Sequence, residues 1–391
     1  MKFQPVGVDE RISSLDVIRG FSLLGILLVN MFGFYLPMPH IYDLSYWFTE
    51  AKDIIHHQLL DIYVQSSFYP LFSMLFGYGL AMQYMKAQQI ERNFYKFAPR
   101  RLGILFFIGL LHAFFIWWGD ILATYAFCGV FLLLLIRFSS GWLIATAITL
   151  NLLFHAFFIY MYAVFGLLNQ PVEQPAVDLT SIQNAITAYG TGTWTDAFIQ
   201  RLADLAIQLS PLAWVASLLT ILPYMLIGAA AAKWRLIERA KEKVWLWLVL
   251  AVVGVGLGLF IKNAPILFTR THLLDYLKVY VGGPILSIGY IAVIVLVCLV
   301  PFAVKILSPI AKAGRMSLTL YIMQSIVCTT LFYHFGFSLY GQVDVAMGVY
   351  IALGIYVVQL VIAELWLSKF AQGPLEVAVK KITYGKMLSE K

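Results

Sequence analysis

Two apolar stretches of the sequence each carry an arginine that is followed, eleven residues later, by a second polar side chain. Arg19 precedes Asn30, and Arg101 precedes His112. Eleven residues make close to three turns of an α-helix, so each pair lies on one helix face, about 16 Å apart along the axis. Arginine binds phosphate and carboxylate groups, and histidine accepts a proton near neutral pH. The spacing is therefore consistent with proton transfer beside an anionic part of a substrate.

A simpler interpretation of the same residues needs no chemistry. Asp16 stands three residues before Arg19, so the two can form a neutral pair while the arginine reaches the membrane surface. Asn30 and His112 can each hydrogen-bond a neighbouring helix. Asp120 is expected at the outer boundary of its stretch, where it is either solvated or paired with a histidine whose basicity it raises. The residues alone leave both interpretations open.

A further candidate for proton transfer is His40, which follows the first apolar stretch just past two prolines. The prolines prevent the helix from continuing outward, so the chain can fold back toward the bundle. We predict that Asn30 and His40 converge on a cavity that opens outward, with His40 as general base and Asn30 as its orienting or oxyanion partner. His112 with Asp120 is the second choice for the base.

Two more apolar stretches carry polar side chains that we assign to substrate binding. Asp61 and Gln65 are four residues apart, on one face of a predicted helix that a later proline kinks, and we expect them in the outer half of the membrane. Tyr321 and Gln324 fall on overlapping faces of a late helix, with Gln324 near mid-membrane. The full set of predicted binding residues is Asp16, Arg19, Asp61, Gln65, Arg101, Tyr321 and Gln324.

The composition requires that a membrane protein positions these residues. The 391 residues are 61% hydrophobic and only 12% charged, whereas soluble domains are about 25% charged, and the mean hydropathy is +0.83. The net charge of +7 fits cytoplasmic loops rich in Lys and Arg and gives no reason to expect nucleic acid. The three cysteines lie within apolar stretches, so we expect buried thiols and no metal site. The sequence predicts an all-α, polytopic membrane helix bundle.

About ten apolar stretches have a length that can span a membrane, which is roughly 17 to 25 residues. The predicted spans are 14–36, 57–85, 102–119, 121–137, 141–167, 211–232, 244–261, 278–300, 316–336 and 347–368. One set of loops, together with the two chain ends, holds 22 of the 27 Lys and Arg residues. The positive-inside rule therefore predicts that both the N and the C termini are cytoplasmic.

A long polar segment divides the predicted spans into two halves, 1–167 and 211–391. Segment 168–210 is predicted to hold amphipathic helices on the outer membrane surface, with Arg201 and Asp204 on the side opposite the apolar residues. The basic C-terminal tail is likewise amphipathic and is predicted to lie on the inner surface.

Four ordered motifs resemble the YeiB-like family of bacterial multi-pass membrane proteins. They are RISSLDVIRGFSLLGILLVN near the start, the GLLH…WWGDIL…Y run, the GRMSLTLYIMQS helix and the late GPLE…TYG. The resemblance covers nearly the whole chain. It implies a protein of the bacterial cytoplasmic membrane and says little about activity.

A wider resemblance concerns the N-terminal third. The SLDVIRG…VN run followed by a histidine is similar to the start of heparan-α-glucosaminide N-acetyltransferase, and FYPLFSMLFG is similar to the following span there. An asparagine and a histidine are implicated in acetyl transfer in that family, and they correspond to Asn30 and His40. The membrane acyltransferases that O-acylate bacterial surface glycans have an arginine and a histidine in their first helix. Arg19 corresponds to that arginine, but this chain has Asn30 at the position of the histidine. The resemblance implies a transmembrane acyltransferase fold.

Residues and resemblance together predict acyl transfer. An acyl-CoA such as acetyl-CoA would enter from the cytoplasm, where Arg19 and Arg101 meet its phosphates, and a hydroxyl or amine of an envelope glycan or lipid would bind from outside. A histidine would take the acceptor proton, and an amide or cation would stabilise the oxyanion. The alternatives are a transporter or exporter of a small or amphipathic solute, and a non-catalytic lipid-binding protein. A homodimer is a further option that the sequence leaves open.

Overall fold

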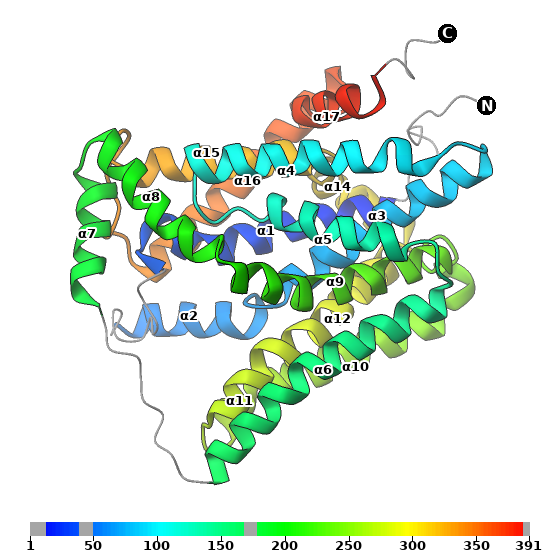
Figure 1. Cartoon of the computed structure of the whole chain (residues 1–391), viewed down its shortest axis with the longest axis horizontal. Helices are drawn as coiled ribbons and strands as arrows, with labels where there is room; N and C mark the ends of the chain where they lie inside the picture. Colours follow the sequence, from blue (N-terminus) through cyan, green and yellow to red (C-terminus); the bar gives the residue numbers. More distant parts are fainter. Residues whose placement is uncertain (1–12, 39–49, 168–177, 386–391) are drawn as a thin grey trace.

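Helices supply the regular structure of residues 13–38, 50–167 and 178–385, the parts of the chain that this computed structural model describes (Figure 1). The α-helices are α1 (Ser13–Tyr35), α2 (Ala51–Tyr63), α3 (Phe68–Gln89), α4 (Ala98–Phe115), α5 (Leu122–Leu135), α6 (Ser140–Leu167), α7 (Leu179–Gly190), α8 (Trp194–Gln208), α9 (Pro211–Lys233), α10 (Val244–Leu267), α11 (His272–Leu277), α12 (Gly283–Val297), α13 (Pro301–Ile306), α14 (Ser308–Arg315), α15 (Ser317–Phe332), α16 (Val345–Lys369) and α17 (Pro374–Tyr384). Short 3-10 turns occur at η4 (Phe94–Lys96) and η5 (Ala240–Lys243), and a π-helical turn occurs at η6 (Lys278–Gly282). The predicted all-α fold is confirmed.

Seven helical segments of the described chain are long and apolar enough to cross a membrane. They are Ser13–Tyr35, Phe94–Phe115, Ser140–Val164, Pro211–Lys233, Ala240–Leu267, His272–Val297 and Val345–Lys369. Each overlaps one of the predicted spans, and the shorter apolar helices α5 and α15 overlap the predicted fourth and ninth spans. The protein is therefore a polytopic helical membrane protein.

The predicted span 57–85 is wrong as one continuous helix. The chain breaks between Tyr63 and Phe68, and Ser66 takes a positive φ of 62°. Pro70 causes no kink because it lies in the first turn of α3, where a missing N–H breaks no helical hydrogen bond. The carbonyls that the break frees are satisfied by distant side chains, since Lys262 Nζ donates to the oxygen of Gln65 and a serine hydroxyl of α12 donates to that of Ser67.

Glycines allow the closest crossings between helices. A Cβ added at Gly77 of α3 would lie 1.9 Å from the Met225 carbonyl oxygen of α9, and one added at Gly228 of α9 would lie 1.9 Å from the Met74 carbonyl oxygen of α3. Gly254 of α10 meets α12 in a similarly close contact. Small residues drive helix association in lipid because they let backbones approach, so these positions fix the bundle.

α8 presents its charged side to the protein, which differs from the arrangement predicted for a helix lying on the surface. Arg201 and Asp204 are only 1% and 2% exposed, whereas Trp194 and Ile199 are exposed. Arg201 donates to the Phe114 carbonyl oxygen at 3.1 Å, so the charged side of α8 covers the end of α4. The amphipathic pattern correctly predicts that α8 has an apolar and a charged side. Which of the two sides faces the protein depends on hydrogen-bond partners on other helices, which the pattern does not show.

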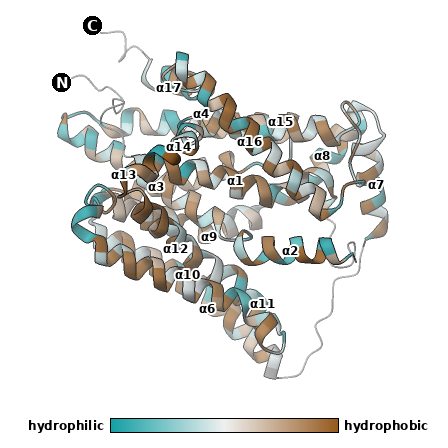
Figure 2. Cartoon of the chain, turned by 180° about the vertical axis from the view of Figure 1, so that it is seen from behind, coloured by the Kyte–Doolittle hydropathy of each residue, from teal (hydrophilic) through white to brown (hydrophobic). Residues whose placement is uncertain are grey.

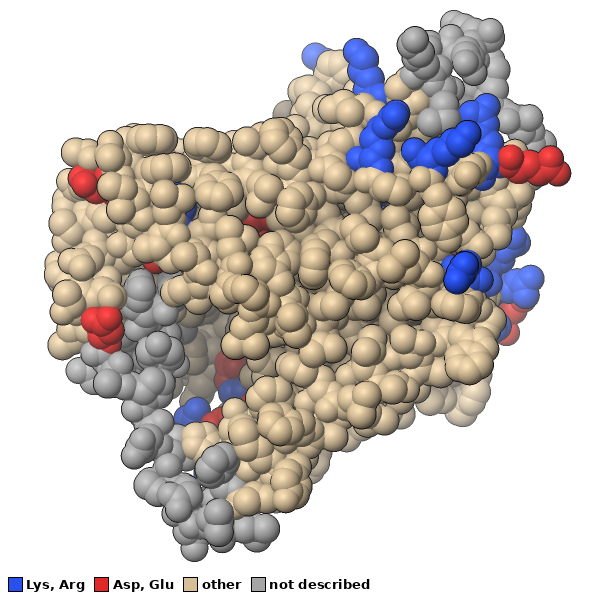
Figure 3. Space-filling model, viewed as in Figure 1, with Lys and Arg blue, Asp and Glu red and all other residues tan. Residues whose placement is uncertain are grey.

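Charge and hydropathy separate along the bundle. α1 packs against α15, and in Figure 1 α6, α10 and α11 diverge from the rest of the bundle. Figure 2 shows hydrophobic residues along α10, where exposed side chains such as Trp245 and Val252 suit contact with lipid. Figure 3 shows Lys and Arg gathered toward the end of the bundle where α17 lies. The basic residues thus cluster as the loop charges predicted.

Candidate functional site

A buried histidine–carboxylate pair lies where α4 turns back into α5. His112 and Asp120 are 1% and 3% exposed, and His112 Nδ1 is 2.9 Å from Asp120 Oδ2. The second carboxylate oxygen, Oδ1, accepts the backbone N–H of Ala123 at 2.8 Å. Gln208 of α8 donates to the Asp120 carbonyl at 2.6 Å, which holds the turn in place. Asp120 is therefore paired with His112, which was one of the two alternatives for it.

The pairing leaves one ring nitrogen of His112 available for chemistry. An ionised carboxylate only accepts hydrogen bonds, so Nδ1 carries the proton and Nε2 carries the lone pair. His112 Nε2 is buried and has no hydrogen-bond partner in the described part of the chain. A base whose other nitrogen is oriented by a carboxylate is the recurring arrangement of acid–base catalysts.

Tyr321 connects this pair to a cavity. Its ring centroid lies 5.3 Å from that of His112, and its hydroxyl oxygen accepts the backbone N–H of Ile121 at 3.4 Å. Because the hydroxyl is used as an acceptor there, its own proton can be donated to a ligand. Tyr321 and Ile121 both line the cavity.

The central cavity has a volume of about 300 Å³ and lies among α1, α3, α4, α5, α15 and α17. Apolar side chains come mainly from α1, α3, α4 and α5, and most of the polar ones come from α17 and the residues before it. The lining residues are Leu23, Ile26, Phe72, Phe76, Gln83, Arg101, Leu105, Ile121, Leu122, Ser317, Leu318, Tyr321, Gln372, Glu376, Val379, Lys380, Thr383 and Tyr384. The cavity can therefore hold a molecule with one apolar and one polar end.

Three polar atoms of the cavity lining are buried without hydrogen-bond partners in the described residues. They are Gln83 Oε1, Arg101 Nη1 and Thr383 Oγ1. Buried polar groups are almost always satisfied in folded proteins, so such atoms on one cavity wall indicate a ligand or ordered water. The cavity thus offers a cationic donor from Arg101, an accepting amide oxygen from Gln83 and a hydroxyl from Thr383 to a ligand that has both an anionic group and an N–H or O–H donor.

α17 closes the polar end of the cavity. Glu376 accepts the backbone N–H groups of Leu318 and Thr319 at 2.8 and 3.1 Å and the Thr319 hydroxyl at 2.5 Å, so it fastens α17 to the start of α15. Burial raises the pKa of the Tyr384 hydroxyl, and the charge of Arg101 opposes that rise. Tyr384 therefore stays a neutral hydrogen-bonding group above the cavity.

The two arginines that were predicted to bind a donor have different surroundings. Arg19 Nη1 lies 3.0 Å from Asp16 Oδ1, so the predicted neutral pair is confirmed. Arg101 has no such carboxylate partner among the described residues and lines the cavity. The geometry favours Arg101 as an anion-binding group, and ligand binding by Arg19 or Asp16 stays a prediction.

The structure does not bring the remaining predicted residues to the cavity wall. His40 lies outside the described residues, so its predicted convergence with Asn30 stays a prediction. Asn30 is partly exposed on α1 and makes no hydrogen bond to a described residue. Gln324 is buried and donates to Gln359 Oε1 at 2.9 Å, which joins α15 to α16 and uses its amide in packing.

Asp61 and Gln65 belong to a different part of the molecule. Asp61 pairs with Lys278 of η6 at 2.5 Å. The prediction that Asp61 and Gln65 share a helix face is wrong, because α2 ends at Tyr63 and Gln65 lies in the turn beyond it. Gln65 is exposed, and the interaction that it makes with the bundle is through its backbone oxygen, which accepts a hydrogen bond from Lys262 Nζ.

Sequence reasoning missed the cavity residues on α3 and α17. Gln83 lies in a helix whose apolar neighbours gave no functional signal. Glu376, Thr383 and Tyr384 stand within the GPLE…TYG motif, so that motif was the signal that could have identified them. Among the described residues, no group of three or more His, Cys, Asp or Glu side chains is arranged to hold a metal ion.

Comparisons with known proteins establish the family. The sequence model of the family described as "Protein of unknown function (DUF418)" matches residues 231–386. The uncharacterized protein YxaH of Bacillus subtilis is 34% identical over 402 residues, which cover 97% of this chain and 96% of that protein. The uncharacterized protein YeiB of Escherichia coli is 26% identical and covers 96% of each chain. The chain belongs to the YeiB-like family.

The family match includes part of the site. Residues 231–386 contain Tyr321 and the whole of α17. Arg101, His112 and Asp120 lie outside that match, in the part of the chain that only the alignments with whole relatives cover. A further relative is an uncharacterized 39.9 kDa protein encoded in the amylase 3′ region of Bacillus acidopullulyticus, 28% identical over 98% of this chain and 96% of that protein. No solved structure matches the chain. The names of the family and of these relatives state no activity, so the wider acyltransferase resemblance stays a prediction.

Proposed function

We propose that this YeiB-like protein is an integral-membrane acyltransferase in which His112 is the general base. The observation that carries the proposal is the buried His112–Asp120 pair, whose Nε2 has no partner in the described residues and which adjoins a cavity through Tyr321. A buried base without a structural partner is unfavourable for stability and useful for proton transfer.

In the proposed reaction, an acceptor hydroxyl or amine attacks the carbonyl carbon of an acyl thioester. His112 Nε2 takes the acceptor proton as the new C–O or C–N bond forms, and Asp120 stabilises the resulting imidazolium. The Tyr321 hydroxyl donates to the oxyanion of the tetrahedral intermediate. The C–S bond then breaks, and the leaving thiolate takes the proton from His112, which restores the neutral base.

The donor is an acyl-CoA, acetyl-CoA being the smallest of the class. Arg101 and His112 are both on α4 and eleven residues apart, which corresponds to about 16 Å. The long flexible arm of CoA between its phosphates and its thioester suits that separation. Arg101 Nη1, Gln83 Oε1 and Thr383 Oγ1 would meet the polar part of the arm, and the apolar walls near Tyr321 would hold the acyl group.

The proposed location is the bacterial cytoplasmic membrane, with the end that carries α17 in the cytoplasm. The support is the gathering of Lys and Arg at that end and the bacterial origin of the relatives. In this orientation the end of the central cavity that α17 covers faces the cytoplasm, the side from which the donor would come. The acceptor, an envelope glycan or lipid, would reach the base from the opposite side.

The deciding experiment uses the purified full-length protein with isotopically labelled acetyl-CoA and extracted envelope material. We expect a labelled acyl ester or amide in the products by mass spectrometry, together with free CoA. The contrary result has two parts. The protein yields no acylated product with any envelope fraction although it binds acetyl-CoA, and it carries an unmodified solute across the membrane of proteoliposomes. Such a protein is a transporter, and that result would overturn the proposal.

A further inference from the structure

A second polar cluster lies where α2, α10 and η6 meet, apart from the central cavity. Lys278 Nζ is 2.5 Å from Asp61 Oδ2, and Lys262 Nζ is 2.5 Å from the carbonyl oxygen of Gln65. Lys262 is only 1% exposed. A Cβ added at Gly282 of η6 would lie 2.9 Å from Lys262 Cγ, so the lysine stem packs directly on the π-helical turn. Such turns are frequent at functional sites.

The charges of this cluster do not balance. The pair formed by Lys278 and Asp61 is neutral, and Lys262 contributes a second ammonium, which among the described residues donates to a backbone oxygen. Arg270 and Asp275, which precede η6, form an ion pair that is neutral in itself. Two lysines thus share the single carboxylate of Asp61 among the described residues, and an anion at the exposed edge of the Lys278–Asp61 pair would compensate the remaining charge.

The cluster is open to a ligand. The side chains of Lys278 and Asp61 remain 15% and 26% exposed. Figure 3 shows a hollow in the surface between the main bundle and the divergent helices, with Lys or Arg atoms and Asp or Glu atoms together at its base. A ligand that enters the hollow can therefore reach charged groups within the membrane-embedded part of the protein.

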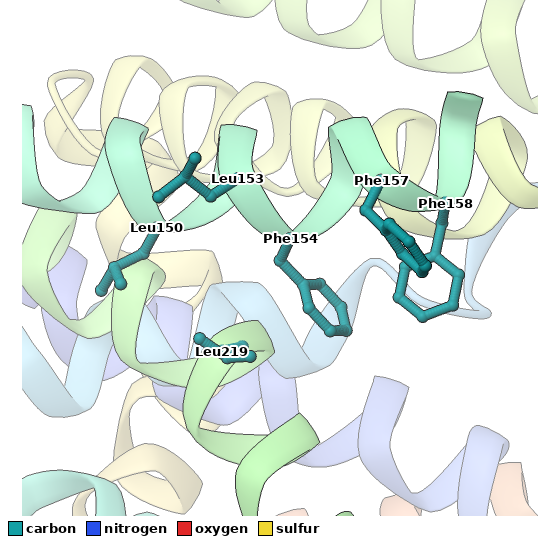
Figure 4. Close-up of a pocket in the computed structure, with 6 residues that line it drawn as sticks. All are labelled: Leu150, Leu153, Phe154, Phe157, Phe158 and Leu219. Atoms are coloured by element: carbon teal, nitrogen blue, oxygen red, sulfur yellow. The ribbon is translucent and has the colours of Figure 1, made fainter. Parts of the chain in front are cut away.

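An apolar groove lies on α6 and α9, and one of its residues contacts the segment that carries Lys278. It has a volume of about 420 Å³ and is lined by Leu150, Leu153, Phe154, Phe157 and Phe158 of α6 and Leu219 of α9 (Figure 4). The ring of Phe158 lies 5.7 Å from that of Tyr276, with the two rings stacked. Tyr276 is two residues before Lys278 and also lies 4.7 Å, ring to ring, from Tyr280 of η6. The groove and the lysine cluster are thus joined through these aromatic rings.

We propose that this surface binds an anionic membrane lipid, with the phosphate of its headgroup at the partly exposed Lys278, attracted also by the charge of the buried Lys262, and an acyl chain in the groove between α6 and α9. The charge imbalance selects an anion, and the groove selects an anion that carries an apolar chain. The site shares no residue with the central cavity or with the His112–Asp120 pair, so its test is independent of the proposed acyl transfer.

The headgroup is tested by native mass spectrometry of the full chain titrated with phosphatidylglycerol or with phosphatidylcholine. Lys278→Met should weaken phosphatidylglycerol binding roughly fivefold and leave phosphatidylcholine binding unchanged, because it removes one lysine charge. Asp61→Asn should strengthen phosphatidylglycerol binding by a similar factor. Arg270→Met, the same charge change at an exposed position, is the control and should change neither.

The opposite signs of these two variants separate a lipid site from a structural ion pair. If Lys278 and Asp61 form only a structural ion pair, Lys278→Met and Asp61→Asn should both lower thermal stability. The ratio of the affinities for the two lipids should then stay at its wild-type value. That outcome, or equal effects of Lys278→Met on both lipids, would overturn the proposal.

The chain is tested by filling the groove. Leu219→Trp should weaken phosphatidylglycerol binding, whereas Leu212→Trp, an exposed position on the same helix outside the groove, should not. Inorganic phosphate at millimolar concentration should compete poorly with the lipid, because it lacks the chain. If phosphate displaces the lipid fully and Leu219→Trp has no effect, the site binds a free anion and the assignment to lipid is wrong.

Discussion

Asparagine in place of Asp120 changes one oxygen to an amide and leaves the shape of the side chain nearly intact. In the native protein Oδ1 accepts the Ala123 N–H at 2.8 Å, and Oδ2 accepts His112 Nδ1–H at 2.9 Å. Asparagine offers one accepting oxygen for these two donors. If that oxygen stays on Ala123, the new NH₂ group faces His112 and donates to Nδ1, which moves the ring proton to Nε2.

That tautomer cannot act as the base, because Nε2 no longer has a lone pair to accept the acceptor proton. General-base catalysis contributes about 10²- to 10⁴-fold, so the rate of acyl transfer in Asp120→Asn should fall by that factor. This corresponds to about 2.7–5.4 kcal/mol of transition-state stabilisation. The expected loss of folding stability is smaller, about 1.5–3 kcal/mol for one hydrogen bond to a charged group.

The assay combines acetyl-transfer rate, thermal stability and ¹⁵N NMR of the histidine ring, which distinguishes the Nδ1–H from the Nε2–H tautomer. Asp204→Asn is the matched control, because Asp204 is equally buried and accepts hydrogen bonds from Tyr189 and Gln200. It should lose stability without losing the catalytic rate per folded molecule. A folded Asp120→Asn protein with an Nε2–H signal and an unchanged rate would refute the role of His112 as base.

Four other results are expected. Arg101→Gln should weaken CoA binding in calorimetry and reduce its salt dependence, whereas the exposed neighbour Arg100→Gln should do so much less. Gly77→Ala should lower the yield of folded protein, because its Cβ would overlap a carbonyl of α9, while Gly256→Ala, with open space around it, should be tolerated. Reporter fusions between α6 and α7 should indicate the outside and fusions between α9 and α10 the inside; the reverse pattern contradicts the orientation. The ion pair with Lys52 lowers the pKa of Asp344, so its contribution to stability is present above pH 3.8 and should be lost as the pH falls further, which a comparison with Asp344→Asn across that range can measure.

Hydropathy predicted the positions of the membrane helices well, because the thickness of the bilayer requires long apolar runs wherever a helix crosses. It could not predict the break after Tyr63. Pro70 predicts an interruption of the helix, but the break lies before it. The break depends on Lys262 and Ser287, which lie about two hundred residues later and donate hydrogen bonds to the carbonyl oxygens that it frees. The local sequence therefore predicts which segments are apolar, whereas hydrogen bonds to distant residues determine where a helix is interrupted.

The candidate site was predictable in part for a similar reason. The eleven-residue spacing of Arg101 and His112 identified two residues on one helix, because both belong to α4. The approach of Tyr321 and Thr383 to that helix is a tertiary contact that no spacing reveals. The pairing of Asp120 with His112 was one of two alternatives, and only the geometry of the turn into α5 distinguishes them.

Hydrogen bonding distinguishes His112 from two equally buried glutamines of this protein. Gln324 and Gln359 lie as deep as His112, yet each donates to a defined acceptor, so packing accounts for them. Packing does not account for His112, since an apolar side chain would fill the site without leaving a buried nitrogen unsatisfied, a defect worth about 1–3 kcal/mol. Unpartnered buried atoms also occur on other residues of the described chain, such as Arg201, Gln208 and Trp247, and none of these three lines the central cavity. His112 does not line it either, but its ring contacts Tyr321, which does. A buried base that adjoins a cavity holding three more unsatisfied polar atoms is best explained by a ligand that satisfies them together.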